Sequence, residues 1–200
     1  MAADMEWITT STILQSLKEF HNQSAWQRFA ERFRPSIVRF ARKLGLSEAE
    51  AEDVAQETLA AFAAAYRDGR YDRDKGRLSR WLFGIAYRQA QRARTGQARR
   101  AGMEGAPENT SFWEHAPDEQ SLARLWDQQW EQGLLEQCLR QVRQEVEPST
   151  MRAFEAVALA DRAPAAVAAE TGLSVKAVYA AKYRVLKRIR ELRAALEDMT

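Results

Sequence analysis

The sequence of 200 residues holds one cysteine, two histidines, five prolines and nine glycines. A lone cysteine, Cys138, excludes an internal disulfide, and no Cys-x-x-Cys or Cys/His cluster offers the ligands of a zinc site. No window approaches 18 uninterrupted apolar residues, and the first residues lack the basic flank and apolar core of a signal peptide. We therefore expect a cytoplasmic protein with no metal, no cofactor and no segment inserted in a membrane.

What dominates instead is alanine, leucine, arginine, glutamine and glutamate, which favour helices. The sequence therefore predicts an all-α fold. The formal net charge is only +2, so any affinity for a polyanion has to come from where the charges gather along the chain.

Three helices are expected in the first half of the chain. Apolar residues recur every three or four positions up to Leu44, and Gly45 then marks a helix end. Ser47 and Glu50 have the spacing of a capping box, which opens the second helix. The helices are expected over residues 24–44, 47–66 and 78–94, with a polar loop over 67–77.

Helical periodicity stops between Thr95 and Gln120, where glycines, prolines and small polar residues accumulate. A new helix is expected from Ser121 to near Pro148, and three further helices fit into 149–199. The predicted organisation is two small helical domains, residues 11–95 and 121–198, joined by a flexible linker over 96–120.

The segment PAAVAAETGLSVKAVYAAKYRVLKRIREL has the pattern of a helix-turn-helix. Pro164 begins a short helix, Gly172 supplies a left-handed turn residue, and Ser174 caps the next helix. Its inward side chains are expected to be Val175, Val178, Tyr179, Leu186 and Ile189. Glu191 is the only carboxylate between Lys176 and Arg193, which favours nucleic-acid binding. An ordinary amphipathic hairpin with a solvated basic face is the alternative reading.

A second basic tract, residues 67–100, interleaves arginines with aromatic residues. Guanidinium groups bind phosphates and aromatic rings stack on unpaired bases, so this mixture suits melted DNA or another single strand. Tyr71, in the polar loop, is the better candidate for stacking on a base, whereas Trp81 is expected in the core.

The segment SEAEAEDVAQET is opposite in sign and places carboxylates on one helical face. Such spacing could ligate a metal, but those sites need Glu-x-x-His pairs, and the chain has only His21 and His115. Two interpretations stay open for this face: a solvated surface, or a docking surface for a basic protein partner.

Taken in this order, these segments resemble the two domains of extracytoplasmic function sigma factors of bacterial RNA polymerase, from about Ser11 to Leu196. AEAEDVAQETLAAF resembles the helix that docks on the clamp helices of the polymerase largest subunit. GRLSRWLFGIAYRQAQ is similar to the segment that melts the promoter and reads the minus-ten element. The carboxyl-terminal segment from ALADRAP onwards resembles the helix-turn-helix that reads the minus-thirty-five element as duplex.

The resemblance implies a role for individual residues of this chain. Contacts to core polymerase would come from Glu50, Asp53, Gln56 and Glu57. Contacts to the minus-ten element would come from Arg70, Tyr71, Arg77, Arg80, Trp81, Tyr87, Arg88 and Arg92. Contacts to the minus-thirty-five element would come from Ser174, Lys176, Ala177, Tyr179, Ala180, Lys182, Tyr183, Arg184, Lys187 and Arg188.

The partners so implied are bacterial core RNA polymerase, promoter DNA in duplex and melted form, and an anti-sigma factor as a further candidate. Catalysis would belong to the polymerase, so the chain itself is not expected to be an enzyme. The sequence departs from the family pattern at Leu78, Arg88 and Ala166, where phenylalanine, asparagine and glutamate are common.

Two rival functions are weighed against the resemblance. A free-standing helix-turn-helix regulator with an amino-terminal sensing or dimerisation bundle would bind duplex without polymerase, but gives no reason for the tract of arginines and aromatic residues. A nuclease would need a catalytic cluster, and the sequence offers no phosphate loop or nucleophile motif.

Overall fold

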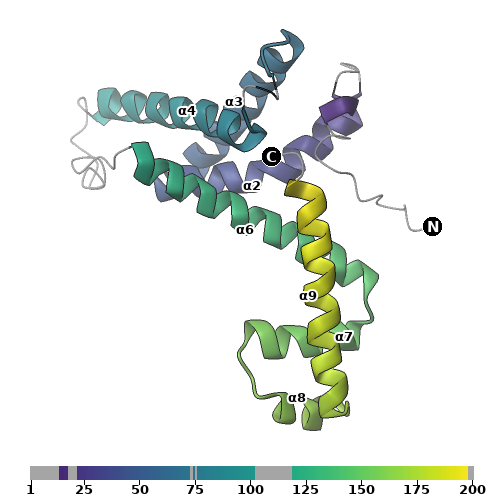
Figure 1. Ribbon diagram of the computed structural model, residues 1–200. Coiled ribbons are helices and arrows are strands. Elements are labelled where there is room, and N and C mark those ends of the chain that lie inside the picture. The colour runs from purple at the N-terminus through teal and green to yellow at the C-terminus, as the bar shows by residue number, and fades with distance from the viewer. Residues whose placement is uncertain (1–13, 18–21, 73, 75, 102–118, 198–200) are drawn as a thin grey trace. The chain divides into compact units, whose positions relative to one another are not determined.

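The computed structural model describes residues 14–17, 22–72, 74, 76–101 and 119–197 (Figure 1). Every regular element in these ranges is a helix, which confirms the all-α prediction. The chain divides into two compact units at the junction between Gly133 and Leu134. We call the described residues up to Gly133 the first unit and those from Leu134 to Glu197 the second unit.

The first unit contains α2 (Gln23–Lys43), α3 (Glu48–Arg67), α4 (Leu78–Ala101) and the first half of α6 (Glu119–Glu145). The helix starts follow local rules. Asn22 caps α2, its side-chain oxygen accepting a hydrogen bond from the backbone N–H of Ala25 at 3.0 Å. The capping box predicted at Ser47 and Glu50 opens α3, so that prediction is confirmed.

Aromatic side chains form the core of the first unit. Phe29 of α2 stacks on Phe62 of α3 with ring centroids 4.4 Å apart, and both rings are fully buried. The fully buried Leu78 and Leu82 supply the face of α4. Rings of this size bury a large apolar area each, so a short three-helix arrangement obtains a substantial core from few residues.

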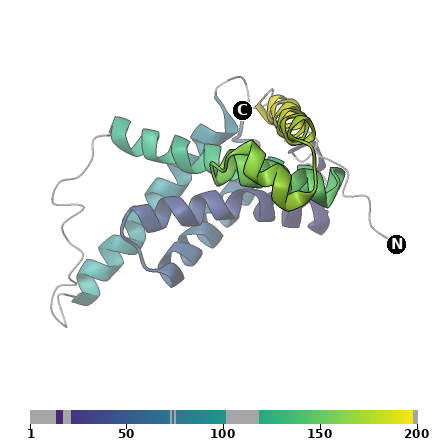
Figure 2. The same cartoon turned by 90° about the horizontal axis from the view of Figure 1, so that it is seen from below.

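The first half of α6 completes this core. Trp126, fully buried, lies edge-on to Phe40 at 5.3 Å, and Trp130 stacks on Phe33 at 5.1 Å. This part of α6 runs beside α2 in both views (Figure 1 and Figure 2). The sequence assigned the whole helix to the carboxyl-terminal domain, whereas its first half packs in the first unit. The predicted limits of the two functional domains, residues 11–95 and 121–198, stay predictions.

Helix α4 is longer than the sequence indicated. It continues past Arg94 to Ala101 and passes through Gly96, so the predicted linker begins with helical residues. A glycine within a helix costs only about 1 kcal/mol, and the glutamine, alanine and arginines that follow are good helix formers. The remainder of the predicted linker, residues 102–118, lies outside the described residues.

The second unit contains the rest of α6 followed by α7 (Pro148–Phe154), a π-helical turn η2 (Glu155–Leu159), α8 (Pro164–Thr171) and α9 (Val175–Glu197). The three helices predicted after residue 149 are therefore confirmed, and the π turn was not foreseen. One core cluster between these helices is made of small side chains: Ala153, Val157, Val167, Ala168, Val178 and Ala181. Larger side chains, among them Met151, Phe154 and Leu192, are also buried in this unit. Among the described helices of both units, none is both long and apolar enough to cross a membrane.

Candidate nucleic-acid interface

The acidic face predicted for residues 50–57 lies along the first turns of α3. Asp53, Gln56 and Glu57 are exposed on this face. Glu50 instead serves the helix start, because its carboxylate accepts hydrogen bonds from the backbone N–H of Ser47 at 3.0 Å and from the hydroxyl of Ser47 at 2.7 Å. The three exposed polar side chains are therefore available to another molecule, and Glu50 has a structural role at the capping box.

The loop after α3 and the start of α4 enclose a hollow of about 340 Å³. Two of its lining residues, Tyr71 and Trp81, stack on each other, with ring centroids 4.9 Å apart and planes inclined by 27°. Arg77 and Arg80 are exposed at its margin. The lining residues are Arg70, Tyr71, Asp72, Gly76, Arg77, Arg80 and Trp81. The structure thus brings together most of the residues that were predicted to contact melted DNA, and it adds Asp72 and Gly76, which no sequence pattern indicated.

The two aromatic residues of this hollow differ from their predicted environments. Tyr71 is half-buried and already stacked, not projecting from the loop. Trp81, expected in the core, is also half-buried, with one edge against Phe62 at 5.3 Å. The pair is held by the core on one side and borders the hollow on the other, so a base that enters the hollow meets a platform already formed.

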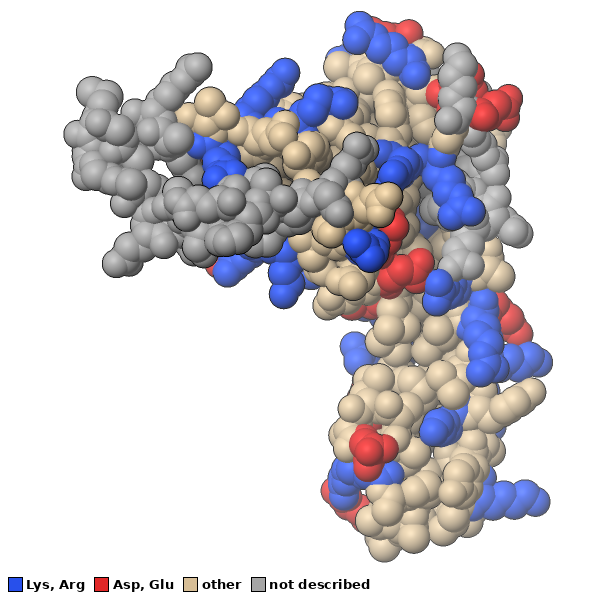
Figure 3. All heavy atoms as spheres, turned by 60° about the vertical axis from the view of Figure 1, so that its left-hand side comes forward, with Lys and Arg blue, Asp and Glu red and all other residues tan. Residues whose placement is uncertain are grey.

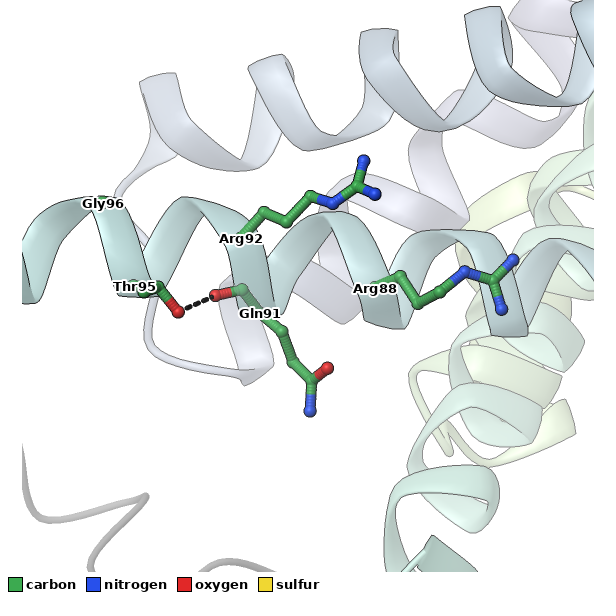
Figure 4. Close-up of a pocket in the computed structure, with 5 residues that line it drawn as sticks. All are labelled: Arg88, Gln91, Arg92, Thr95 and Gly96. Atoms are coloured by element: carbon green, nitrogen blue, oxygen red, sulfur yellow. Dashed lines mark hydrogen bonds between the residues drawn. The ribbon is translucent and has the colours of Figure 1, made fainter.

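The second half of α4 carries a shallow recess of about 480 Å³. Its lining residues are Arg88, Gln91, Arg92, Thr95 and Gly96. Figure 4 shows Arg88 and Arg92 extending along α4 in the same direction, while the hydroxyl of Thr95 donates to the backbone oxygen of Gln91 at 3.0 Å. The sequence predicted the two arginines. It missed the other three, although their spacing of three and four residues from the arginines was a usable signal.

Tyr87, the remaining predicted contact of α4, is partly committed to packing. Its ring lies 6.0 Å from that of Phe83, nearly parallel, and the side chain is half-buried. The start of α4 is fixed from α6, because Nε1 of Trp126 donates a hydrogen bond to the hydroxyl of Ser79 at 3.2 Å. This contact joins residues 47 positions apart in the sequence, and nothing in local periodicity predicts it.

In the second unit, α8 and α9 are joined by a short turn in which Gly172 has a φ of 70°. Only glycine adopts this left-handed conformation without steric cost. The hydroxyl of Ser174 then accepts a hydrogen bond from the backbone N–H of Ala177 at 3.1 Å, as an N-cap does. Both local predictions, the turn glycine and the cap, are confirmed.

The exposed face of α9 differs from the predicted one at two residues. Val175 and Tyr179 were expected to point inward, but they are 42% and 57% exposed. The buried stripe runs instead through Val178, Ala181, Val185 and Ile189. Tyr179 follows the buried Val178 by one residue, about 100° around the helix, and so leaves the core.

The other predicted contacts of α9 divide by exposure. Lys176, Ala180, Tyr183, Arg184 and Lys187 are exposed, whereas Ala177, Lys182 and Arg188 are half-buried. Basic side chains project from the right-hand edge of the part formed by α7 to α9 (Figure 3). An anion approaching α9 therefore meets cations beside a partly apolar surface.

Arg188 is engaged within the second unit. Its guanidinium donates to both carboxylate oxygens of Glu145 in α6, at 2.6 and 3.1 Å, and to Glu191 at 3.2 Å. The hydrogen bond from Arg188 holds the pKa of Glu145 below its ordinary value, against the opposing effect of burial. The same bond raises the pKa of Arg188. A DNA phosphate would have to compete with Glu145 for this side chain.

Within the described ranges, no three His, Cys, Asp or Glu side chains gather where they could hold a metal ion. What the described surfaces offer is an acidic face on α3, an arginine-lined aromatic hollow, a recess on α4 and a basic face on α9.

Residues 29–100 match the family model of sigma-70 region 2. The match begins within α2 and includes α3, the loop after it and most of α4, so it contains both the acidic face and the arginine-lined hollow. It supports a role as a sigma factor in promoter recognition, and members of this family are transcription initiation factors, not enzymes. A search of curated proteins found no match.

Proposed function

We propose that this chain is a sigma factor of the extracytoplasmic function type, which acts in the cytoplasm. Its first unit binds core RNA polymerase and melts and reads the minus-ten element. Its second unit reads the minus-thirty-five element as duplex, and an anti-sigma factor is a further partner. The observation that carries the proposal is the aromatic hollow inside the segment that matches sigma-70 region 2.

The hollow has the chemistry that single-stranded DNA requires. Tyr71 and Trp81 present a stacked pair of rings, and each base that stacks on such a surface contributes about 1–3 kcal/mol. Arg77 and Arg80 lie at the margin, where phosphates on either side of an unpaired base would pass. Pre-formed stacking also reduces the free energy needed to hold a base out of the duplex.

The acidic face of α3 supports the polymerase-binding part of the proposal. Asp53 and Glu57, with the neutral Gln56 beside them, make this exposed face of α3 negative, and charge of this kind directs a complementary partner into register. The patch lies on a helix and not a loop, and its helix is fixed by the capping box at Ser47. Such a surface suits docking against another helix.

The turn between α8 and α9 supports duplex reading by the second unit. Gly172 and Ser174 set the path of the chain between the two helices, and the exposed face of α9 carries Lys176 and Lys187. In helix-turn-helix proteins the second helix enters the major groove with its first turns.

The first experiment is co-purification of the tagged full chain with bacterial core RNA polymerase. We expect the parent chain to bind, and a variant with Asp53, Gln56 and Glu57 all changed to alanine to lose at least tenfold in affinity. A matched control changes Asp127, Gln128 and Glu131 of α6 to alanine, because these exposed residues have the same chemical types and the same total charge. Equal loss in both variants would show that general charge, and not the α3 face, governs binding.

A second experiment tests the hollow with the assembled complex and a fluorescent pool of single-stranded oligonucleotides. The binding constant for the oligonucleotides falls as the salt concentration rises. Changing Arg77 and Arg80 to alanine should make this dependence weaker, reducing the magnitude of the slope of log K against log salt concentration by about 0.7 for each lost phosphate contact. The matched control is the double alanine variant at Arg124 and Arg140, which are exposed on α6. An unchanged slope in the Arg77 and Arg80 variant would show that the DNA strand does not pass through the hollow.

A folded parent chain that binds duplex DNA but not polymerase would instead favour the free-standing regulator. Circular dichroism of the same sample establishes whether the chain is folded, because its helical content is high.

A further inference from the structure

The first turns of α9 expose apolar surface beside their basic side chains. Val175, Tyr179 and Tyr183 follow one another at intervals of four residues and are 42%, 57% and 67% exposed. Residues at this spacing lie on one side of a helix, so the three side chains form an exposed stripe beside the buried face that contains Val178 and Val185. Ala180 is exposed beside them.

The same turns lack the side chains that usually read adenine and cytosine. Between Ser174 and Tyr183 the sequence has no Arg, Asn, Gln, Asp or Glu. Bidentate contacts to adenine, and acceptor contacts to the cytosine amino group, need Asn, Gln, Asp or Glu. The donors to guanine on the exposed face of these turns are Lys176 and the hydroxyls of Ser174, Tyr179 and Tyr183. Thymine differs from the other bases by its 5-methyl group, which apolar side chains contact.

The stripe has dimensions that fit a few base pairs. Eight residues separate Val175 from Tyr183, which is about 12 Å along the helix axis. Base pairs succeed one another at about 3.4 Å, so the stripe spans about four of them. Lys182 and Lys187 lie at and beyond its far end, where they can reach the phosphates that border the groove.

We infer that the first turns of α9 recognise thymine through its 5-methyl group in duplex DNA, with Val175, Tyr179 and Tyr183 as the contacting residues. The inference rests on the proposed function, because it takes α9 as the helix that enters the major groove. It adds the specificity: the tract read by the second unit contains thymines whose methyl groups meet the stripe. The basic side chains around the stripe supply affinity that does not depend on the base.

The test is selection from two pools of randomised duplexes by the full chain assembled with core polymerase. One pool contains thymine, and the other contains uracil in its place, which lacks only the 5-methyl group. We expect the thymine pool to yield an upstream tract with fixed thymines, and the uracil pool to lose that preference. For a selected duplex, each thymine replaced by uracil at a contacted position should weaken binding about fourfold, the effect of burying one methyl group.

Variants of the stripe complete the test. In Tyr179→Ala and Tyr183→Ala the ratio of affinities for thymine and uracil duplexes should fall toward one, whereas Lys187→Ala should weaken both duplexes equally. If both pools yield the same upstream tract, and the parent binds thymine and uracil duplexes with equal affinity, methyl recognition is wrong, but the proposed sigma function is not affected. No upstream tract from either pool, despite polymerase binding, would overturn duplex reading by the second unit and the inference with it.

Discussion

In the first unit aromatic rings pack against one another, from Trp26 through to Trp130. In the second unit, by contrast, Tyr179 and Tyr183 of α9 extend into solvent, and the buried face of that helix consists of valine, alanine, isoleucine and leucine. Rings in the first unit therefore combine two roles, because Trp81 touches the core and also lines the hollow. In the second unit the roles are separate. Core substitutions there should change stability alone, and surface tyrosines should change binding alone.

The largest expected effect comes from Trp126→Ala, which removes a fully buried ring between Phe40 and Phe83. We expect a loss of about 3–5 kcal/mol in the free energy of unfolding of the first unit, from lost burial and the cavity left behind. Chemical denaturation followed by tryptophan fluorescence measures it. The control, Tyr183→Ala, should change stability by about 0.5 kcal/mol or less. A loss below about 1 kcal/mol for Trp126→Ala would mean that α6 does not belong to this core.

A smaller effect is expected for Val178→Ala in the second unit, where the deleted atoms are few. Loss of the buried valine methyl groups should cost about 2 kcal/mol. The four tryptophans within the described ranges, Trp26, Trp81, Trp126 and Trp130, all belong to the first unit, so tryptophan fluorescence reports mainly on that unit and far-ultraviolet circular dichroism on both. The variant should shift the dichroism transition and leave the fluorescence transition in place. A matching shift in both signals would show that the two units unfold together.

The junction of the units offers a third substitution, Gly133→Ala. A β-carbon built at Gly133 would come within 2.2 Å of the hydroxyl oxygen of Ser36 in α2, which is buried. The clash should outweigh the gain in helix propensity and leave a net loss of about 1 kcal/mol in the first unit. Adding Ser36→Ala removes the clashing oxygen and should restore most of the stability. If Gly133→Ala alone stabilises the protein, the close approach of α6 to α2 is not maintained in solution.

The smallest effect concerns pH and the ion pair of Glu145 with Arg188. The folded state lowers the pKa of Glu145 below its ordinary value of 4.5, chiefly through the hydrogen bond from Arg188. The stabilisation is therefore present above about pH 4.5 and is lost as the pH falls through the lower, folded pKa. Both side chains are partly exposed, so the effect should be below about 1 kcal/mol.

Comparison of the parent with Glu145→Gln isolates the stability contributed by the charge of Glu145. The difference in unfolding free energy between parent and variant, measured by dichroism, should shrink as the pH is lowered from 7 to 3. A difference that stays constant across this range would show that the pair contributes nothing through the charge of Glu145.

Local patterns in the sequence predicted much of the candidate site. Ser47 and Glu50 three residues apart specified a helix start, and Gly172 followed by Ser174 specified the turn before α9, because such features depend on neighbours within one turn. The same reasoning predicted that Val175 and Tyr179 are buried in the second unit, but both are exposed. The apolar residues in the first turns of a helix such as α9 are compatible with burial of either of two adjacent faces. Only the position of the packing helices determines which face is covered.

The sequence by itself determined that the chain is helical, where most of its helices begin, and that arginines alternate with aromatic residues around one loop. Tertiary structure alone decided that Trp126 packs in the first unit, that Tyr71 stacks on Trp81, and that Arg188 pairs with Glu145. The physical reason is that hydrogen-bonded turns and caps are satisfied locally. Burial of an apolar stripe and neutralisation of a charge are satisfied by whichever distant residue the fold brings near.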